Sequence, residues 1–240
     1  MATVANAVAR LREIEASAPR DDGVVCFARL YREVTEGVAA QLDAHTFQNS
    51  AFVEALDVRF AALFFSAHAA FARDPRHAPR AWLPLFERRA RRDIEPIQFA
   101  LAGMNAHINR DLPVALVGTC GSLGLDLREG SAEHDDYLRV NALLARVEAR
   151  VKQSYLSGWT KLAARLLHRA GRADDVVAMW DVERARDAAW TNGMALWRLR
   201  GDPKLSAEFV STLDGLVGLA GKGLLAPPRS ALGRLRRVLG

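Results

Sequence analysis

Cysteine is scarce in this sequence. The 240 residues include two cysteines, Cys26 and Cys120, and neither belongs to a CxxC or another metal-binding spacing. Disulfide-stabilised secreted proteins and zinc modules need more cysteines at closer spacing, whereas single cysteines in apolar stretches are typical of reduced cores. The sequence therefore predicts a cytoplasmic protein without a disulfide framework.

Long hydrophobic runs are also missing. No stretch reaches the roughly 18 consecutive apolar residues that span a bilayer, so we expect no transmembrane segment. The N-terminal stretch MATVANAVARLREIEAS is interrupted by charged residues where a signal peptide needs an unbroken apolar region. We predict a soluble chain that contacts membranes at most peripherally.

Lysine is also scarce. The chain has four lysines, so its net charge of +5 depends on arginine. Arginine-rich and alanine-rich composition often follows from a GC-rich genome, so the charge alone does not indicate nucleic-acid binding, and we expect no nucleic-acid partner. The basic amphipathic tail, Ser230 to Gly240, is a candidate for peripheral contact with a membrane face or an acidic partner.

Helical periodicity is what the sequence does contain. Half of the residues are hydrophobic, enough to bury a sizeable core, and no stretch shows a sustained strand alternation. We therefore predict a single all-α domain over residues 1–240, a bundle of about eight to ten helices. The oligomeric state is left open.

Caps, prolines and glycines mark the predicted helix ends. The pattern indicates helices over residues 50–73, 82–92 and 133–155, one that begins at Pro96, a long one that ends near residue 200, and one that begins at Pro203. Pro113 should kink the central helix, because proline lacks a backbone N–H and clashes with the preceding turn. Glycines at 118, 121 and 124 predict a kinked or frayed continuation beyond it.

The central helix places polar residues beside its apolar stripe. On a helical projection, Asp111 and Asn105 fall about 60° to either side of the stripe's centre. His107 lies beside Asp111, and residues four apart on a helix can share a proton, a metal or a hydrogen bond. The alternative is that Asp111 merely caps a helix that restarts at Pro113.

Other helices also direct polar groups inward. Asp57 falls on the apolar face of the helix over residues 50–73, and Asn141 follows Tyr137 by one turn with Asp136 at the edge of the same stripe. Buried carboxylates are costly unless they are paired or bound to a metal, so several of them around one interior indicate a common site. The alternatives are a pairing of Asp57 with a core arginine or tyrosine and a helix-register role for Asn141.

The long helix before residue 200 offers a second polar group. The spacing places Glu183 and Asp187 on the face of Trp190, with Arg186 on its shoulder. The alternative is a solvent-exposed, salt-bridged helix face with the tryptophan in the core.

Motifs for the common cofactors are absent. The sequence has no dinucleotide or flavin motif, no phosphate-binding loop, no nucleophile elbow and no HExxH. His107 and Asp111 have the spacing of two ligands to a divalent metal such as zinc or iron, and Asp57 and His68 are the candidate partners. A divalent metal is therefore the one cofactor that the pattern admits.

Four sequence blocks carry a family resemblance: GMNAHINRDLP from Gly103, FVEALDVRFAALFF from Phe52, DYLRVN from Asp136 and ARDAAW from Ala185. They resemble the recurring blocks of an all-helical bacterial family catalogued as domain of unknown function 5995. The family-like core covers residues 22–200, and residues 203–240 form C-terminal helices and the basic tail. The resemblance implies no activity. It implies that the following residues stand at shared motif positions: Asn105, His107, Asn109, Asp111, Asp57, Asp136, Asn141, Arg186 and Trp190.

These observations lead to two functional hypotheses. The first is an enzyme that binds a small molecule inside the bundle, with Asp57, His107 and Asp111 as acid–base or metal-binding groups. Asp111 would fix the imidazole tautomer and raise its pKa, and hydrolysis, elimination or cyclisation would fit. The residues expected to bind or orient the substrate are Asn105, Asn141, Asp136, Tyr137, Arg186 and Trp190. The second is a non-catalytic binding or protein-interaction module whose polar cluster is structural.

Overall fold

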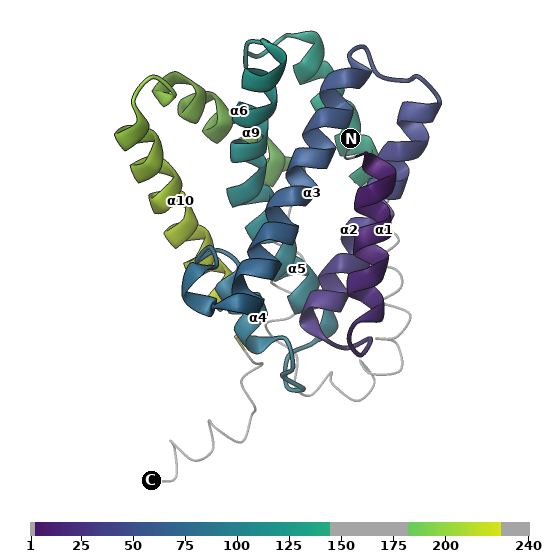
Figure 1. Ribbon diagram of the computed structural model, residues 1–240, viewed down its shortest axis with the longest axis vertical. Helices are drawn as coiled ribbons and strands as arrows, with labels where there is room; N and C mark the ends of the chain where they lie inside the picture. The colour runs from purple at the N-terminus through teal and green to yellow at the C-terminus, as the bar shows by residue number, and fades with distance from the viewer. Residues whose placement is uncertain (1–2, 145–181, 227–240) are drawn as a thin grey trace.

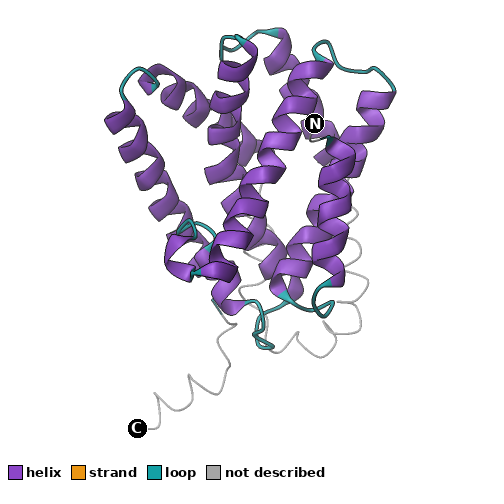
Figure 2. Ribbon diagram, viewed as in Figure 1, coloured by secondary structure: helices purple, strands orange, loops and turns teal. Residues whose placement is uncertain are grey.

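Helices make up all the regular structure in the residues that the computed structural model describes, 3–144 and 182–226 (Figure 1, Figure 2). The all-α prediction is therefore confirmed. The elements are α1 (Val4–Ala16), α2 (Gly23–Asp43), α3 (Ser50–Arg73), a 3-10 turn (Pro75–His77), α4 (Leu83–Arg88), α5 (Pro96–Ala106), a π-turn (His107–Asp111), α6 (Leu112–Leu123), a helix over residues 132–144, α9 (Val182–Leu199) and α10 (Pro203–Leu224).

Side-chain caps set the helix ends much as the sequence predicts. Asn49 accepts a hydrogen bond from the backbone N–H of Phe52, and α3 covers residues 50–73 as expected. Asp202 caps α10 in the same way through two backbone N–H groups. The helix predicted over 82–92 is shorter, because α4 ends at residue 88. The part of the helix predicted over 133–155 that follows residue 144 and the basic tail lie outside the described residues.

The central helix, which the sequence predicts to kink at Pro113, widens into a π-turn just before that residue. α5 passes through the π-turn into α6 without interruption, and Pro113 stands in the first turn of α6. A wider turn accommodates the proline ring, which would otherwise clash with the carbonyl of the preceding turn. The fraying predicted beyond Pro113 was wrong: α6 continues through two glycines and ends where Gly124 adopts a left-handed φ of 64°.

The continuous rod of α5, the π-turn and α6 is central to the packing. α2 and α10 pack on α5, α3 and α9 pack on α6, and α1 packs on α2. The close approach of α2 and α5 depends on Gly103, since a Cβ there would lie 2.4 Å from ring atoms of Phe27. The rod therefore has α2 and α3 on one side and α10 on another. The polar residues of the π-turn lie between these two groups of helices.

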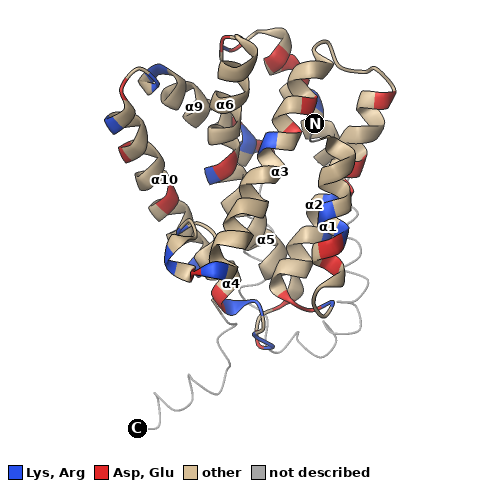
Figure 3. Cartoon of the chain, in the orientation of Figure 1, with Lys and Arg blue, Asp and Glu red and all other residues tan. Residues whose placement is uncertain are grey.

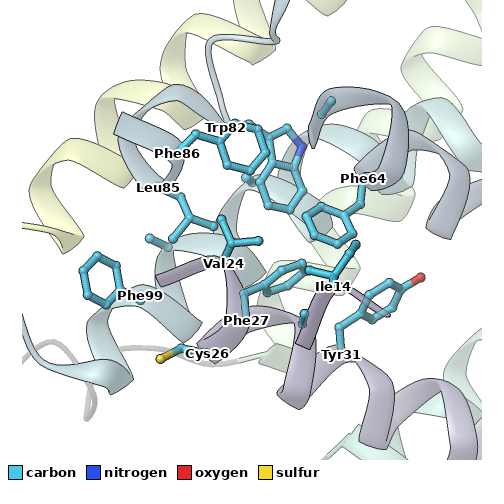
Figure 4. Close-up of a cluster of buried hydrophobic side chains, with 14 of the residues drawn as sticks. Ile14, Val24, Cys26, Phe27, Tyr31, Phe64, Trp82, Leu85, Phe86 and Phe99 are labelled. Atoms are coloured by element: carbon cyan, nitrogen blue, oxygen red, sulfur yellow. The ribbon is translucent and has the colours of Figure 1, made fainter. Parts of the chain in front are cut away.

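Two hydrophobic clusters form the core. The first surrounds Phe27, which lies among the rings of Tyr31, Phe64 and Trp82 (Figure 4). The second surrounds α6 and includes Phe52, Leu112, Leu116 and Trp190. Phe60 and Met104 pack against both clusters, so the boundary between the two lies beside the π-turn.

α3 is the one described helix long and apolar enough to cross a membrane, judged by length and composition alone. Most of its ribbon is uncharged in Figure 3. Core helices of soluble proteins share this property, and α3 buries Phe52, Ala61 and Phe64 against the other helices. In the structure, 22% of its most apolar 18-residue window is buried, so core packing accounts for part of its apolar character.

Candidate functional site

A cavity of about 80 Å³ lies between α2, α3, the π-turn, α9 and the helix over residues 132–144. Aliphatic and aromatic side chains form most of its wall. The residues of the wall with polar groups are Tyr31, Asp57, His107, Asp136, Tyr137 and Arg186. An apolar cavity with a few convergent polar groups is the usual form of a small-molecule site.

His107 and Asp111 form the pair that the spacing predicts. Nδ1 of His107 lies 3.2 Å from Oδ2 of Asp111, and both side chains are buried. Asp111 also accepts hydrogen bonds from Nε1 of Trp82 at 3.0 Å and from Nη1 of Arg110 at 2.7 Å. An ionised carboxylate can only accept hydrogen bonds, so Nδ1 of His107 carries the imidazole proton and donates it to Asp111. Nε2 of His107 therefore carries the lone pair.

Aromatic rings enclose the imidazole of His107. Phe60 stacks on it with 3.4 Å between ring centroids, and the ring of Tyr31 is 4.4 Å away. Burial lowers the pKa of His107 below its ordinary value of 6.5, and the hydrogen bond and charge of Asp111 oppose this shift without reversing it. Asp111 therefore raises the imidazole pKa as expected, but desolvation lowers it by more, so the net shift of the pKa is downward. Nε2 of His107 has no hydrogen-bond partner among the described residues.

Asp57 reaches the cavity from α3. It lies on the buried face of that helix as predicted, and its side chain is enclosed. Oδ2 of Asp57 has no hydrogen-bond partner in residues 3–144 and 182–226. Burial raises the pKa of this carboxyl from 3.8 to about 7. Asp57 is therefore poised to exchange a proton near neutral pH.

Tyr31 is a site residue that the sequence reading missed. Its buried hydroxyl has no hydrogen-bond partner within bonding distance in the described part of the chain. The nearby hydroxyl of Thr35 donates to the backbone carbonyl of Tyr31. Burial and the nearby Asp57 carboxyl hold the pKa of Tyr31 well above its ordinary value of 10.0, and Thr35 lowers that pKa by less than these two causes raise it. The available signal was its position four residues after Phe27, on the buried face of α2.

Arg186 meets two of its predicted companions. Its Nε donates to Oδ1 of Asn141 at 2.5 Å, and its Nη2 donates to the carbonyl of Tyr137 at 2.8 Å. The guanidinium lies over the Tyr137 ring at 3.9 Å, and the Tyr137 hydroxyl donates to the carbonyl of Arg186 at 2.7 Å. Burial lowers the pKa of Arg186. These contacts hold the guanidinium in the cavity wall.

Asn105 lies on the other side of the rod. Its amide donates to the carbonyl of Val217 on α10 at 3.0 Å, and Asn109 donates to the Asn105 carbonyl oxygen. The structure therefore gives Asn105 a helix-joining contact, and it does not line the cavity.

Asp136 and Trp190 also make structural contacts. Both oxygens of Asp136 accept backbone hydrogen bonds, from Gln48 at 2.9 Å and Asn49 at 2.6 Å, which ties the helix over residues 132–144 to the start of α3. Trp190 packs against Tyr137 with 4.8 Å between centroids and is absent from the cavity wall. Asp136 therefore lines the cavity with its oxygens already engaged.

Two predicted carboxylates of α9 face away from the interior. Glu183 and Asp187 are exposed, whereas Arg186 is buried between Val182 and Trp190 on the packed face. Each of the two carboxylates follows a residue of that face by one position, which rotates it about 100° toward solvent. The prediction that both lie on the Trp190 face was wrong.

The candidate metal ligands are not gathered into one cluster. His68 packs against Phe64 and Phe86, beside α4, whereas His107 and Asp57 line the cavity. Within residues 3–144 and 182–226, no group of three His, Cys, Asp or Glu side chains is placed to hold a metal ion. The metal assignment remains a prediction.

Comparison with known proteins identifies the family. No curated protein and no solved structure matches the chain. A family model described as a family of unknown function, DUF5995, matches residues 4–227, a longer span than the core predicted from the four sequence blocks. Since this match covers most of the sequence, the chain belongs to the DUF5995 family.

Proposed function

We propose that the protein is an acid–base enzyme that transforms a small, mainly apolar molecule bound in the cavity. The observation that carries this proposal is the set of three unpartnered polar atoms in one cavity wall: Oη of Tyr31, Oδ2 of Asp57 and Nε2 of His107. A buried polar atom without a partner costs about 1–3 kcal/mol, so structural networks avoid such atoms and functional sites concentrate them. We call these three residues the cavity triad.

The triad divides naturally into a base, an acid and a neutral donor. Nε2 of His107 accepts a proton, because its lone pair is free and Asp111 holds the other ring nitrogen. Asp57 supplies or takes a proton, because its pKa is about 7. Tyr31 stays neutral and donates a hydrogen bond to a substrate oxygen. In an elimination, Nε2 takes a proton from a substrate carbon, the electrons of that C–H bond form a double bond, and protonated Asp57 gives its proton to the leaving group. In a cyclisation, Asp57 protonates the group whose electrons start ring closure, and Nε2 takes the proton released at the end. Proton exchange with water then resets both groups.

The alternative is a binding protein that uses the same cavity without chemistry. The observation in its favour is that the wall is almost entirely apolar, as expected for a carrier of a hydrophobic molecule. Cysteine usage supports a cytoplasmic setting for either activity, and the resemblance to a bacterial family supports a bacterial source; we include both in the proposal.

Isotope incorporation separates catalysis from binding. Purified protein is incubated in D₂O with the apolar extract of cells that produce it, and the extract is searched by mass spectrometry. We expect wild type to consume a compound or to place deuterium in it, because base and acid exchange protons with solvent. His107→Gln and Asp57→Asn should lose this effect. A compound that co-purifies unchanged and unlabelled would support the carrier alternative and contradict the enzyme.

Two controls complete the design. Asp93→Asn removes an exposed carboxyl that is paired with Arg91 and does not line the cavity, so this variant should behave as wild type. Treatment with a chelator tests the metal hypothesis. Turnover that survives chelation supports proton transfer by the triad alone, whereas turnover that is lost and then restored by zinc supports a metal-assisted reaction.

A further inference from the structure

Arg186 brings a positive charge into the cavity wall. The residue is 5% exposed, and its hydrogen bonds go to two neutral oxygens, those of Asn141 and Tyr137. No carboxylate in the described ranges forms an ion pair with it. Its Nη1 donates none of the hydrogen bonds that hold the guanidinium in place.

Three half-buried arginines in the described residues are paired with carboxylates, whereas the half-buried Arg88 donates only to the backbone carbonyls of Lys222 and Leu225. The following pairs join partly buried guanidinium groups to carboxylates at 2.5 to 2.7 Å: Arg32 with Glu15, Arg89 with Asp22, and Arg110 with Asp111. A buried charge is costly unless an opposite charge compensates it, and burial lowers the pKa of Arg186 accordingly. Unlike the three paired arginines, Arg186 has no ion pair in the described residues, and its side chain lines a cavity.

We infer that Arg186 binds an anionic group of the ligand, so that the ligand is an amphipathic acid with an apolar chain. Carboxylates and phosphates both match the forked donors of a guanidinium. Apolar side chains of α2 between Phe27 and Val38 form part of the cavity wall, so the rest of the ligand is an apolar chain. This inference rests on the proposed function only in taking the cavity as the ligand site.

The position of Arg186 also orients the ligand. Its guanidinium is held by the helix over residues 132–144, whereas the cavity triad comes from α2, α3 and the π-turn. The anionic end therefore lies against one wall, and the chain presents another part of its length to the triad. An anionic group bound in this way would fix which bond of the substrate meets His107.

Chain-matched probes test the inference. Calorimetric titration at pH 6 compares decanoate, decyl phosphate and decanol, because at this pH decanoate is ionised and Asp57 is mostly protonated. We expect an anionic probe to bind wild type about tenfold more tightly than decanol. Arg186→Gln should remove that preference and leave decanol binding unchanged. Arg198→Gln, an exposed arginine on the same helix, is the control.

The outcomes separate this inference from the proposed function. Equal affinity of wild type for decanol and both acids overturns the anionic ligand and leaves the cavity as a binding site. A preference that persists in Arg186→Gln overturns the role of Arg186. Failure of all three probes to bind contradicts the cavity as a site for apolar ligands and the proposed function with it. The wild-type comparison decides the ligand class even when Arg186→Gln does not fold, and the stronger acid identifies carboxylate or phosphate.

Discussion

Asp111 and Asp57 are two buried carboxyls in opposite situations. Asp111 accepts from Trp82, Arg110 and His107, on the side of the π-turn that faces α4 and α10. Asp57 has an oxygen without a partner in the described residues, and its pKa is raised to about 7. The same residue type therefore serves as a structural anchor at one position and as an unsatisfied, protonatable group at the other.

The difference between Asp111 and Asp57 shows on which side of the rod the candidate site lies. The network beyond Asp111 is continuous, since Arg110 lies 3.4 Å from Asp214, which accepts from two backbone N–H groups before α4. His107 stands between the two regions, with Nδ1 paired with Asp111 and Nε2 in the cavity wall. Hydrogen bonds that are already made fix the geometry, and polar atoms without partners are available for ligands.

The largest expected effect comes from removal of Asp111. Asp111→Ala leaves three buried donors without their acceptor and Arg110 with a weaker charge partner, so we expect a loss of about 5 kcal/mol in the free energy of unfolding. Urea denaturation followed by circular dichroism measures this loss. Asp93→Ala, which breaks an exposed ion pair with Arg91, should leave the transition in place. A stable Asp111→Ala protein would contradict the anchor role.

The next effect is a pH dependence that belongs to Asp57. Because its folded-state pKa lies above the ordinary value, the folded protein retains a proton that the unfolded chain releases between pH 4 and 7. The stabilisation is fully present below about pH 4 and is lost as the pH rises through about 7. The stability of wild type relative to Asp57→Asn should therefore fall by about 4 kcal/mol between pH 4 and 8.

Denaturation series at each pH check this prediction. Glu54→Gln removes an exposed carboxyl from the same helix and controls for the change in net charge. A constant difference between wild type and Asp57→Asn across the range would show that Asp57 is ionised in the folded state and would remove it as the acid of the triad.

The sequence predicts the fold and half of the site. Asn49 and Pro203 mark helix starts, and periodicity correctly places Asp57, His107 and Asp111 in the interior. It fails where a helix contacts a partner far away in sequence. Asn105 sits at the expected angle, yet its amide meets α10, and periodicity on one helix cannot indicate which neighbour covers a given face.

The charged face of α9 shows a second limit. A packed face centred on Trp190 would direct Glu183 and Asp187 inward. In the structure, the packed face of α9 is centred closer to Arg186. A buried arginine has no distinctive signal in a single sequence, because its partners, Tyr137 and Asn141, come from a different helix. Tyr31 was missed for the opposite reason, since it looked like an ordinary core aromatic.

The smallest expected effect sharpens the comparison most. Tyr31→Phe removes a buried hydroxyl that has no partner among the described residues, so it should change the free energy of unfolding by less than about 0.5 kcal/mol. Tyr137→Phe is the matched control, because its hydroxyl donates to the carbonyl of Arg186, and its loss should cost about 1–2 kcal/mol. Thermal and urea denaturation of both variants give the two values. A hydroxyl without a structural contribution at Tyr31 agrees with a ligand-binding role, whereas a cost equal to that of Tyr137→Phe would place Tyr31 in a saturated network and leave the cavity with two members of its triad.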